Sequence, residues 1–147
     1  MASRDDLARQ LSRLGLRPST HRVRVLSYLQ EHRCHPTIDG IYTALRSESA
    51  SLSRSTVYNV LRAFADAGLV LELDFDGIQT HYDIGTHPHG HFQCRSCGMI
   101  KDFDVDFAPL AAPELKGFDV HERGVLFKGL CPDCVKMQKT DGGDASN

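Results

Sequence analysis

Two pairs of cysteines, each pair separated by two residues, are the feature that most constrains this chain. Cys94 and Cys97 form the first pair, and Cys131 and Cys134 form the second. Four thiolates on two short loops complete the tetrahedral shell that Zn²⁺ prefers. A site filled by four protein ligands leaves no position for a substrate. We therefore expect a structural zinc ion that ties the two segments together and contributes free energy of folding.

A redox dithiol is the alternative for these cysteines. A thioredoxin-like motif is a single CxxC pair in a βαβ pattern, whereas this chain has two pairs, so the spacing favours zinc. The N-terminus has no apolar signal-peptide core, and no apolar run approaches the roughly 20 residues of a membrane helix. We therefore expect a cytoplasmic protein that does not enter a membrane, a compartment in which metal explains the cysteines better than disulfides. No role is assigned to Cys34.

The first half of the chain has the periodicity of four short helices. Apolar residues spaced along one helix face predict a helix over residues 5–14, and a second is expected to begin near Thr20. Thr37 is expected to cap a third helix, and Ser53 or Ser55 a fourth. The predicted core stripe of the fourth helix consists of Val57, Val60, Leu61 and Phe64.

The opposite face of that fourth helix is typical of a recognition helix. Its polar residues are Arg54, Ser55, Thr56, Tyr58, Asn59 and Arg62. Side chains of these types contact phosphates and base edges in DNA. Two strands over residues 69–73 and 80–84, joined by a turn that contains Gly77, are expected to follow as a hairpin. Helices followed by a hairpin predict a winged helix, and a small helical domain with a merely polar face is the alternative.

The charge distribution agrees with contact to nucleic acid. Residues 1–67 contain ten Arg, no Lys and six acidic residues, for a net charge of +4, whereas the remainder carries −6. Arg side chains that neutralise phosphates release counterions and so add affinity. A solvated surface would also explain so modest an excess.

Histidines and carboxylates suggest a second metal site. His89 and His91 project to the same side if they lie on a strand, so both can bind one ion. Further imidazole and carboxylate ligands would give a site suited to Fe²⁺, Mn²⁺, Ni²⁺ or Zn²⁺. The candidate ligands are His35, Asp83, His89, His91 and Asp102. Spacing alone does not bring these residues together, and a hydrogen-bonded imidazole is the alternative for each histidine.

The fold class expected for the whole chain is α+β. Residues 1–84 would form an N-terminal winged helix-turn-helix domain, and residues 85–137 a small α/β dimerisation domain. Apolar residues between Phe103 and Cys131 suggest a strand, a helix and a strand, in a sheet able to pair across a two-fold axis. A self-contained α/β core is the alternative. Residues 138–147 are expected to be a disordered tail.

The chain resembles the ferric uptake regulator superfamily over nearly its whole length. Residues 17–22 resemble the opening of the family's second helix, residues 35–42 the entry to its third, and residues 53–61 its recognition helix. The order of these segments, followed by the histidine pair and both CxxC pairs, is more specific than any segment alone.

This resemblance implies a metal-dependent transcriptional repressor. The four cysteines would hold structural Zn²⁺, and the five N/O ligands would hold a regulatory Fe²⁺ or Mn²⁺ ion, with Ni²⁺ or Zn²⁺ as alternatives. It implies a homodimer that binds palindromic double-stranded DNA, with the regulatory ion bridging the two domains. Tyr58 would reach a base, and nearby Arg and Ser would contact phosphates. The expected DNA-contacting residues are Arg17, Arg22, Arg54, Ser55, Thr56, Tyr58, Asn59 and Arg62.

Asp102 suggests a branch of the family. Peroxide-sensing members resemble this chain in having Asp, where iron-uptake repressors usually have Glu. In those members bound Fe²⁺ reacts with hydrogen peroxide, a ligand histidine (here His35 or His89) is oxidised, the metal is lost and DNA is released. The alternative is a metal-uptake repressor for Fe, Mn, Ni or Zn, and the alternation of His87, His89 and His91 resembles nickel-responsive members.

Two readings from other classes remain. A zinc hydrolase would activate water on a metal held by Asp83, His89 and His91, but no HExxH or comparable signature provides a general base. A zinc-stabilised protein-interaction module would leave the recognition-like helix without a purpose. We therefore expect a regulator and not an enzyme.

Overall fold

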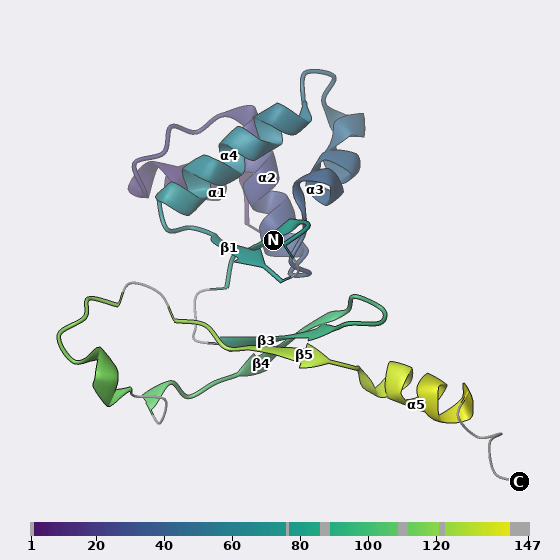
Figure 1. Cartoon of the computed structure of the whole chain (residues 1–147). Helices are drawn as coiled ribbons and strands as arrows, with labels where there is room; N and C mark the ends of the chain where they lie inside the picture. The colour runs from purple at the N-terminus through teal and green to yellow at the C-terminus, as the bar shows by residue number, and fades with distance from the viewer. Residues whose placement is uncertain (1, 76, 86–88, 109–111, 121–122, 142–147) are drawn as a thin grey trace, which may run out of the picture. The chain divides into compact units, whose positions relative to one another are not determined.

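The computed structural model forms two compact units, Met1–Gly85 and Thr86–Asn147 (Figure 1). The residues it describes are 2–75, 77–85, 89–108, 112–120 and 123–141. None of the helices among them has the length and apolar character needed to cross a bilayer.

The first unit begins with four α-helices that each start at a hydroxyl cap, and with one short 3₁₀ helix that has no side-chain cap. They are α1 (Arg4–Arg13), α2 (Thr20–Glu31), α3 (Ile38–Leu45), the short 3₁₀ helix η1 (Arg46–Glu48) and α4 (Arg54–Asp66). The side chains of Ser3, Ser19, Thr37 and Ser53 accept backbone N–H groups from the first turns of α1, α2, α3 and α4. Each cap satisfies one otherwise unpaired donor and contributes about 1 kcal/mol. The predicted caps at Thr37 and Ser53 are confirmed.

The core of this unit is built around α4. Its buried residues are Val57, Val60, Leu61 and Phe64, the stripe that the sequence predicts. They pack against the buried faces of α1, α2 and α3, including Leu11, Leu26 and Ile41. Burying a side chain of this size contributes about 1.5–3 kcal/mol, so this core fixes α4 and leaves its polar face outside.

The predicted wing follows α4 as the antiparallel pair β1 (Leu71–Asp74) and β2 (Thr80–Asp83). The Asp74 carboxylate accepts the N–H of Gly77 at 2.6 Å, and Gly77 has φ of +72°, a conformation that glycine adopts without strain. On the other edge of β2, the N–H of Tyr82 donates to the Pro36 carbonyl at 3.0 Å. The wing is thereby joined to the segment that enters α3.

The second unit contains a three-stranded sheet with the order β4-β3-β5. β3 (His89–Cys94) pairs antiparallel with β4 (Ile100–Asp104) and parallel with β5 (Leu126–Gly129), and α5 (Pro132–Asp141) follows. Figure 1 shows the long excursion of the chain between β4 and β5 that this parallel pairing requires.

Two expectations for this unit need correction. Between β4 and β5, the helix that the structure defines over described residues is a short 3₁₀ turn, η3 (Pro113–Leu115), in place of a longer helix, and Ala108 is also in a 3₁₀ conformation. The disordered tail expected from residue 138 is wrong for residues 138–141, because α5 continues to Asp141. Pro132 suits the first helical position, and the sequence has no glycine from there until residue 142. Residues 142–147 lie outside the described part.

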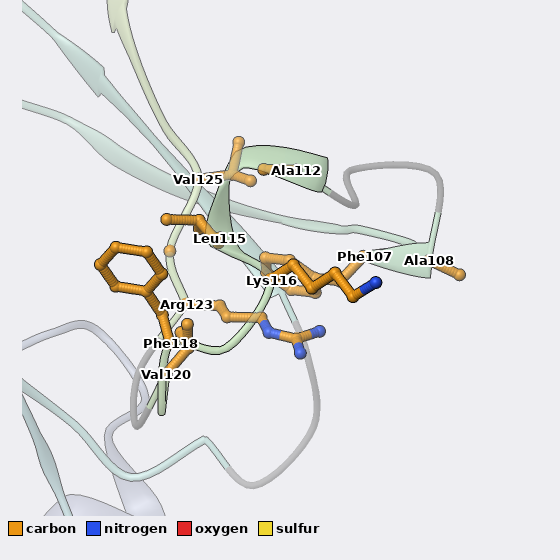
Figure 2. Close-up of a pocket in the computed structure, with 10 residues that line it drawn as sticks. Phe107, Ala108, Ala112, Leu115, Lys116, Phe118, Val120, Arg123 and Val125 are labelled. Atoms are coloured by element: carbon orange, nitrogen blue, oxygen red, sulfur yellow. The ribbon is translucent and has the colours of Figure 1, made fainter.

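The excursion between β4 and β5 presents apolar side chains at the surface. They line an open hollow of about 580 Å³, in which Figure 2 shows Phe107, Leu115, Phe118 and Val125 around one space. The side chain of Phe118 is 68% exposed. Apolar groups gathered in this way mark a surface suited to burial against another chain.

A close contact crosses the sheet at Gly90, between the two histidines of β3. The ring of Phe103 covers this position and stacks on Phe127 of β5 with centroids 5.2 Å apart. A Cβ atom at Gly90 would lie 2.5 Å from two carbons of the Phe103 ring and 2.9 Å from a Val105 methyl group. To make room for a Cβ atom, the Phe103 ring would have to move and change its stacking on Phe127.

We predict that Gly90→Ala destabilises the protein by about 1–3 kcal/mol, the usual cost of overpacking, although alanine is otherwise the less flexible residue in the unfolded chain. Urea unfolding of the zinc-loaded protein measures this change. Gly124→Ala is the matched control, because no described atom lies within 4 Å of its Cβ position. Equal stability of both variants would contradict the contact.

Candidate metal centres and DNA-binding face

The four cysteines converge within the second unit. Cys94 ends β3, Cys97 lies in the turn that follows, and Cys131 and Cys134 flank the start of α5. Their sulfur atoms all lie within 4.8 Å of one another. The turn closes with the N–H of Gly98 donating to the Cys94 carbonyl at 3.0 Å. The sequence therefore folds locally into two thiol-bearing loops that face each other.

The spacing of the sulfur atoms fits a zinc ion. The Sγ atoms of Cys97 and Cys131 are 3.8 Å apart. A tetrahedron with Zn–S bonds of about 2.3 Å has edges of about 3.8 Å, whereas a disulfide requires about 2.05 Å. Cys94, Cys131 and Cys134 are buried, as is usual for a closed structural site.

The electrostatics of the cluster explain why it needs a cation. The backbone N–H of Cys131 donates to Cys94 Sγ and, with the N–H of Cys97, lowers the pKa of Cys94 to about 6. The Ser96 hydroxyl lowers the pKa of Cys134, but the Cys131 and Cys94 thiols outweigh it and raise this pKa to about 12. Four sulfur atoms at these distances do not all ionise by themselves, and a divalent cation removes that barrier.

Two of the predicted N/O ligands meet within the first unit. His35 and Asp83 are both buried, and the imidazole Nε2 lies 3.9 Å from the carboxylate Oδ2. The other carboxylate oxygen, Oδ1, accepts the N–H of Gly85 at 2.8 Å, which orients the side chain of Asp83. His35 has φ of +54°, a left-handed conformation that costs a non-glycine residue free energy.

The other three predicted ligands meet within the second unit. β3 presents His89 and His91 on one face, with ring centroids 4.7 Å apart. Asp102 lies opposite His91 across the β3–β4 ladder, and its Oδ1 is 3.5 Å from Nε2 of His91. Each unit therefore carries a partial N/O donor set suited to a divalent ion such as Fe²⁺ or Mn²⁺.

The recognition-like face of α4 is exposed. Ser55, Tyr58 and Asn59 project outward, and Tyr58 is 47% exposed. Thr56 is turned toward the helix cap, where its hydroxyl lies 2.9 Å from that of Ser53. The outward group offers hydroxyl and amide functions at one surface, which suits contact with base edges.

The predicted DNA-contacting arginines differ in their partners. Arg17 is exposed, and its carbonyl accepts a hydrogen bond from Arg22 Nη1 at 2.9 Å. Arg62 lies 3.5 Å from the Asp66 carboxylate.

Arg54 is held more firmly, by two residues of α3. Its Nε donates to Asp39 at 2.5 Å, and its guanidinium lies 4.5 Å from the centre of the Tyr42 ring. The hydrogen bond to Asp39 raises the pKa of Arg54. A phosphate must therefore compete with Asp39 for this guanidinium.

Two further residues lie beside the candidate metal ligands: Asp104, which the sequence did not single out, and His81, for which the sequence left open only a separate metal site. Asp104 lies opposite His89 in the β3–β4 register, on the same face as Asp102. Asp102 and Asp104 are two residues apart, a spacing that places both on one face of a strand and could have indicated Asp104 as a candidate. His81 contacts the backbone of His35, with Nδ1 2.7 Å from the carbonyl oxygen. No sequence pattern connects residues that far apart. His87 and His121, the other two histidines for which the sequence leaves open a further metal site, lie outside the described residues.

Comparisons with known proteins agree on one family. The sequence pattern of the Ferric uptake regulator family matches residues 13–121. The peroxide operon regulator of Bacillus subtilis is 36% identical over 131 residues, which are 87% of this chain and 90% of that protein. The peroxide-responsive repressor PerR of Staphylococcus epidermidis is 35% identical over 127 residues, 84% of this chain and 85% of that one.

A solved structure gives the same result. The ferric uptake regulator of Vibrio cholerae superposes with a TM-score of 0.71 at 27% identity, over 86% of this chain and all of that one. The predicted α+β class, with a winged helix followed by a small sheet-containing unit, is confirmed. The chain belongs to the ferric uptake regulator family of metal-dependent repressors.

Proposed function

We propose that this chain is a peroxide-responsive repressor whose regulatory ion is shared between its two units. The split donor set, with His35 and Asp83 in one unit and His89, His91 and Asp102 in the other, supports the shared ion. The observation that carries the peroxide response is the similarity over most of the chain to the peroxide operon regulator of Bacillus subtilis and to PerR of Staphylococcus epidermidis. The domain boundaries proposed for this function are 1–84 and 85–137.

Structural zinc is the first element of the proposal. Cys94, Cys97, Cys131 and Cys134 would hold one Zn²⁺ with no open position, so this ion would stabilise the second unit without reacting. The sulfur spacing and the backbone donors to Cys94 support the assignment.

The regulatory ion is the second element. A single Fe²⁺ or Mn²⁺ ion held by all five ligands would restrict how the two units sit relative to each other, because a rigid ligand set is satisfied by few arrangements. Five protein ligands leave room for one more ligand on a six-coordinate ion. Bound Fe²⁺ would supply the redox chemistry that activates hydrogen peroxide. Overall, the imidazole of His35 or His89 would lose two electrons and gain one oxygen atom, and hydrogen peroxide would be reduced to one water.

Oxidation of a ligand would weaken DNA binding because it would weaken metal binding. An oxidised imidazole is a poorer donor, so the His35 half-site and the His89 half-site would lose their common ion. The two winged helices of a homodimer would then lose the spacing that a palindromic site requires. The exposed apolar hollow around Leu115 and Phe118 is the surface proposed to meet the second copy.

A metal-uptake repressor without peroxide chemistry is the second candidate. It would use the same five ligands, and the Mn²⁺, Ni²⁺ or Zn²⁺ forms would respond to ion concentration alone. The residues favour neither reading over the other by geometry, and the peroxide experiment below separates them.

We predict that iron makes the protein sensitive to peroxide and manganese does not. The DNA is a duplex selected from a random pool by the Mn²⁺ form of the protein. Zinc-loaded protein that carries Fe²⁺, prepared anaerobically, should release this duplex when one equivalent of hydrogen peroxide is added. Peptide mass analysis should show one added oxygen atom on His35 or His89. Cys34→Ser is the control for oxidation of the exposed thiol. Retention of DNA and of mass by the Fe²⁺ form would favour the uptake repressor.

Zinc binding is tested by replacing one thiol. Cys131→Ser should reduce zinc content from one ion per chain to nearly none and lower the unfolding temperature of the second unit, because zinc binding to such sites contributes about 10–16 kcal/mol. Elemental analysis and calorimetry provide the measurements. Cys34→Ser, outside the cluster, should keep its zinc. Full zinc content in Cys131→Ser would exclude this ligand set.

The ion pair at the start of α4 predicts a gain in DNA binding. Asp39→Asn should free Arg54 for a phosphate, raise affinity and steepen the slope of log affinity against log salt concentration by about one. Fluorescence anisotropy over a range of salt concentrations measures both. Asp5→Asn removes the same charge from α1 and should change neither, and Arg54→Ala should cancel the gain. Identical behaviour of Asp39→Asn and Asp5→Asn would refute this role for Arg54.

A further inference from the structure

His81 holds the backbone of a proposed metal ligand that is distant in sequence. Its Nδ1 lies 2.7 Å from the His35 carbonyl oxygen. A carbonyl oxygen only accepts hydrogen bonds, so Nδ1 carries the proton and donates it. The next residue of β2, Tyr82, donates its N–H to the Pro36 carbonyl at 3.0 Å. Two successive carbonyl groups of the segment before α3 are thus fixed by two successive residues of the wing.

The segment needs this support because of its conformation. His35 has φ of +54°, a left-handed conformation in which the Cβ of an L-residue is crowded by the neighbouring backbone. Residues other than glycine remain in this region when surrounding contacts hold them there. Fixing the His35 carbonyl fixes the peptide plane that follows this φ, and with it the direction in which the imidazole leaves the chain.

His81 is itself held in place. Its ring meets the ring of Phe75 edge to face, with centroids 5.4 Å apart and planes at 60°. Phe75 is 3% exposed, so the contact is anchored in the interior. In β2, His81 and Asp83 are two residues apart and project to the same face of the strand. One strand therefore provides both the donor to the His35 backbone and the carboxylate 3.9 Å from the His35 ring.

We propose that His81 is a positioning residue for the regulatory metal site. Its Nδ1–H directs the His35 imidazole toward Asp83 before any ion arrives, so that two ligands from separate segments are already oriented. Such preorganisation lowers the ordering cost of binding. The inference rests on the proposed function, because it assigns His81 a role only if His35 and Asp83 are metal ligands.

Three substitutions separate hydrogen bonding from packing. In His81→Asn the amide nitrogen occupies nearly the place of Nδ1 and retains the donor, whereas His81→Gln moves the donor one bond farther and His81→Leu removes it. Zinc-loaded protein without DNA is titrated with Mn²⁺, and free Mn²⁺ is followed by electron paramagnetic resonance. His81→Leu and His81→Gln should bind Mn²⁺ about 10-fold more weakly, the lower end of the usual effect of losing a group that orients a ligand. His81→Asn should bind close to wild type.

Zinc content should be equal in all four proteins. Wild-type affinity in His81→Leu would overturn the proposal. So would equal weakening in His81→Asn and His81→Leu, since that pattern would indicate packing and not the hydrogen bond.

A second readout without Mn²⁺ keeps this test distinct from the proposed function. Long-range ¹H–¹⁵N spectra should show His81 protonated at Nδ1, and the backbone resonances of His35 should shift in His81→Leu and return in His81→Asn. If wild type binds no Mn²⁺ while these spectra behave as stated, the shared metal site fails and the backbone contact stands. If the His35 resonances ignore the substitution, the positioning role fails whatever the Mn²⁺ affinity.

Discussion

The second unit depends on the sulfur cluster in the way that the first depends on aliphatic packing. Around α4 the interior consists mainly of leucine and valine side chains, with Ile41, Phe64 and Tyr82. In the second unit the buried cluster consists of Cys94, Cys131 and Cys134, with Phe92 and Leu130 packed against it. So few apolar residues bury little area, and a divalent cation that neutralises the thiolates would supply the missing cohesion. The β3 histidines stand on a sheet whose end is closed by this cluster.

The proposed N/O ligands differ from ordinary surface residues. His35 is buried in a left-handed conformation in the first unit, and His91 is paired across the strands with Asp102 in the second. His35, Asp83 and His91 are all buried, although each has groups that water would solvate. Keeping such groups out of water costs free energy that a bound ion would offset.

The arginines proposed to contact DNA also differ in how they are paired within the protein. Arg54 is already paired with Asp39, so its phosphate contact would be a competition and not a simple attraction.

Much of this architecture could be predicted from interactions between residues close in sequence, whereas contacts between distant residues could be predicted less well. The caps Thr37 and Ser53 and the stripe from Val57 to Phe64 follow from hydroxyl chemistry and helical period, which act within a few residues. The pairing of His91 with Asp102 could be expected only in outline, because strand register depends on packing across the sheet. The hydrogen bond from His81 to the His35 carbonyl joins residues 46 positions apart, and no sequence pattern predicts it. In the described residues between β4 and β5, the expected helix is present only as short 3₁₀ structure, because apolar content alone does not specify the length or type of a helix.

The central claim is that one ion joins ligands from both units. The most direct test is Mn²⁺ binding to zinc-loaded wild type, His35→Ala, His91→Ala and the double variant, by electron paramagnetic resonance of free Mn²⁺. A shared ion predicts one tight site per chain in wild type, loss of that site in either single variant, and little further loss in the double variant because the effects are not additive. If each single variant keeps a tight site and only the double variant loses binding, the two units bind ions separately and the account is contradicted.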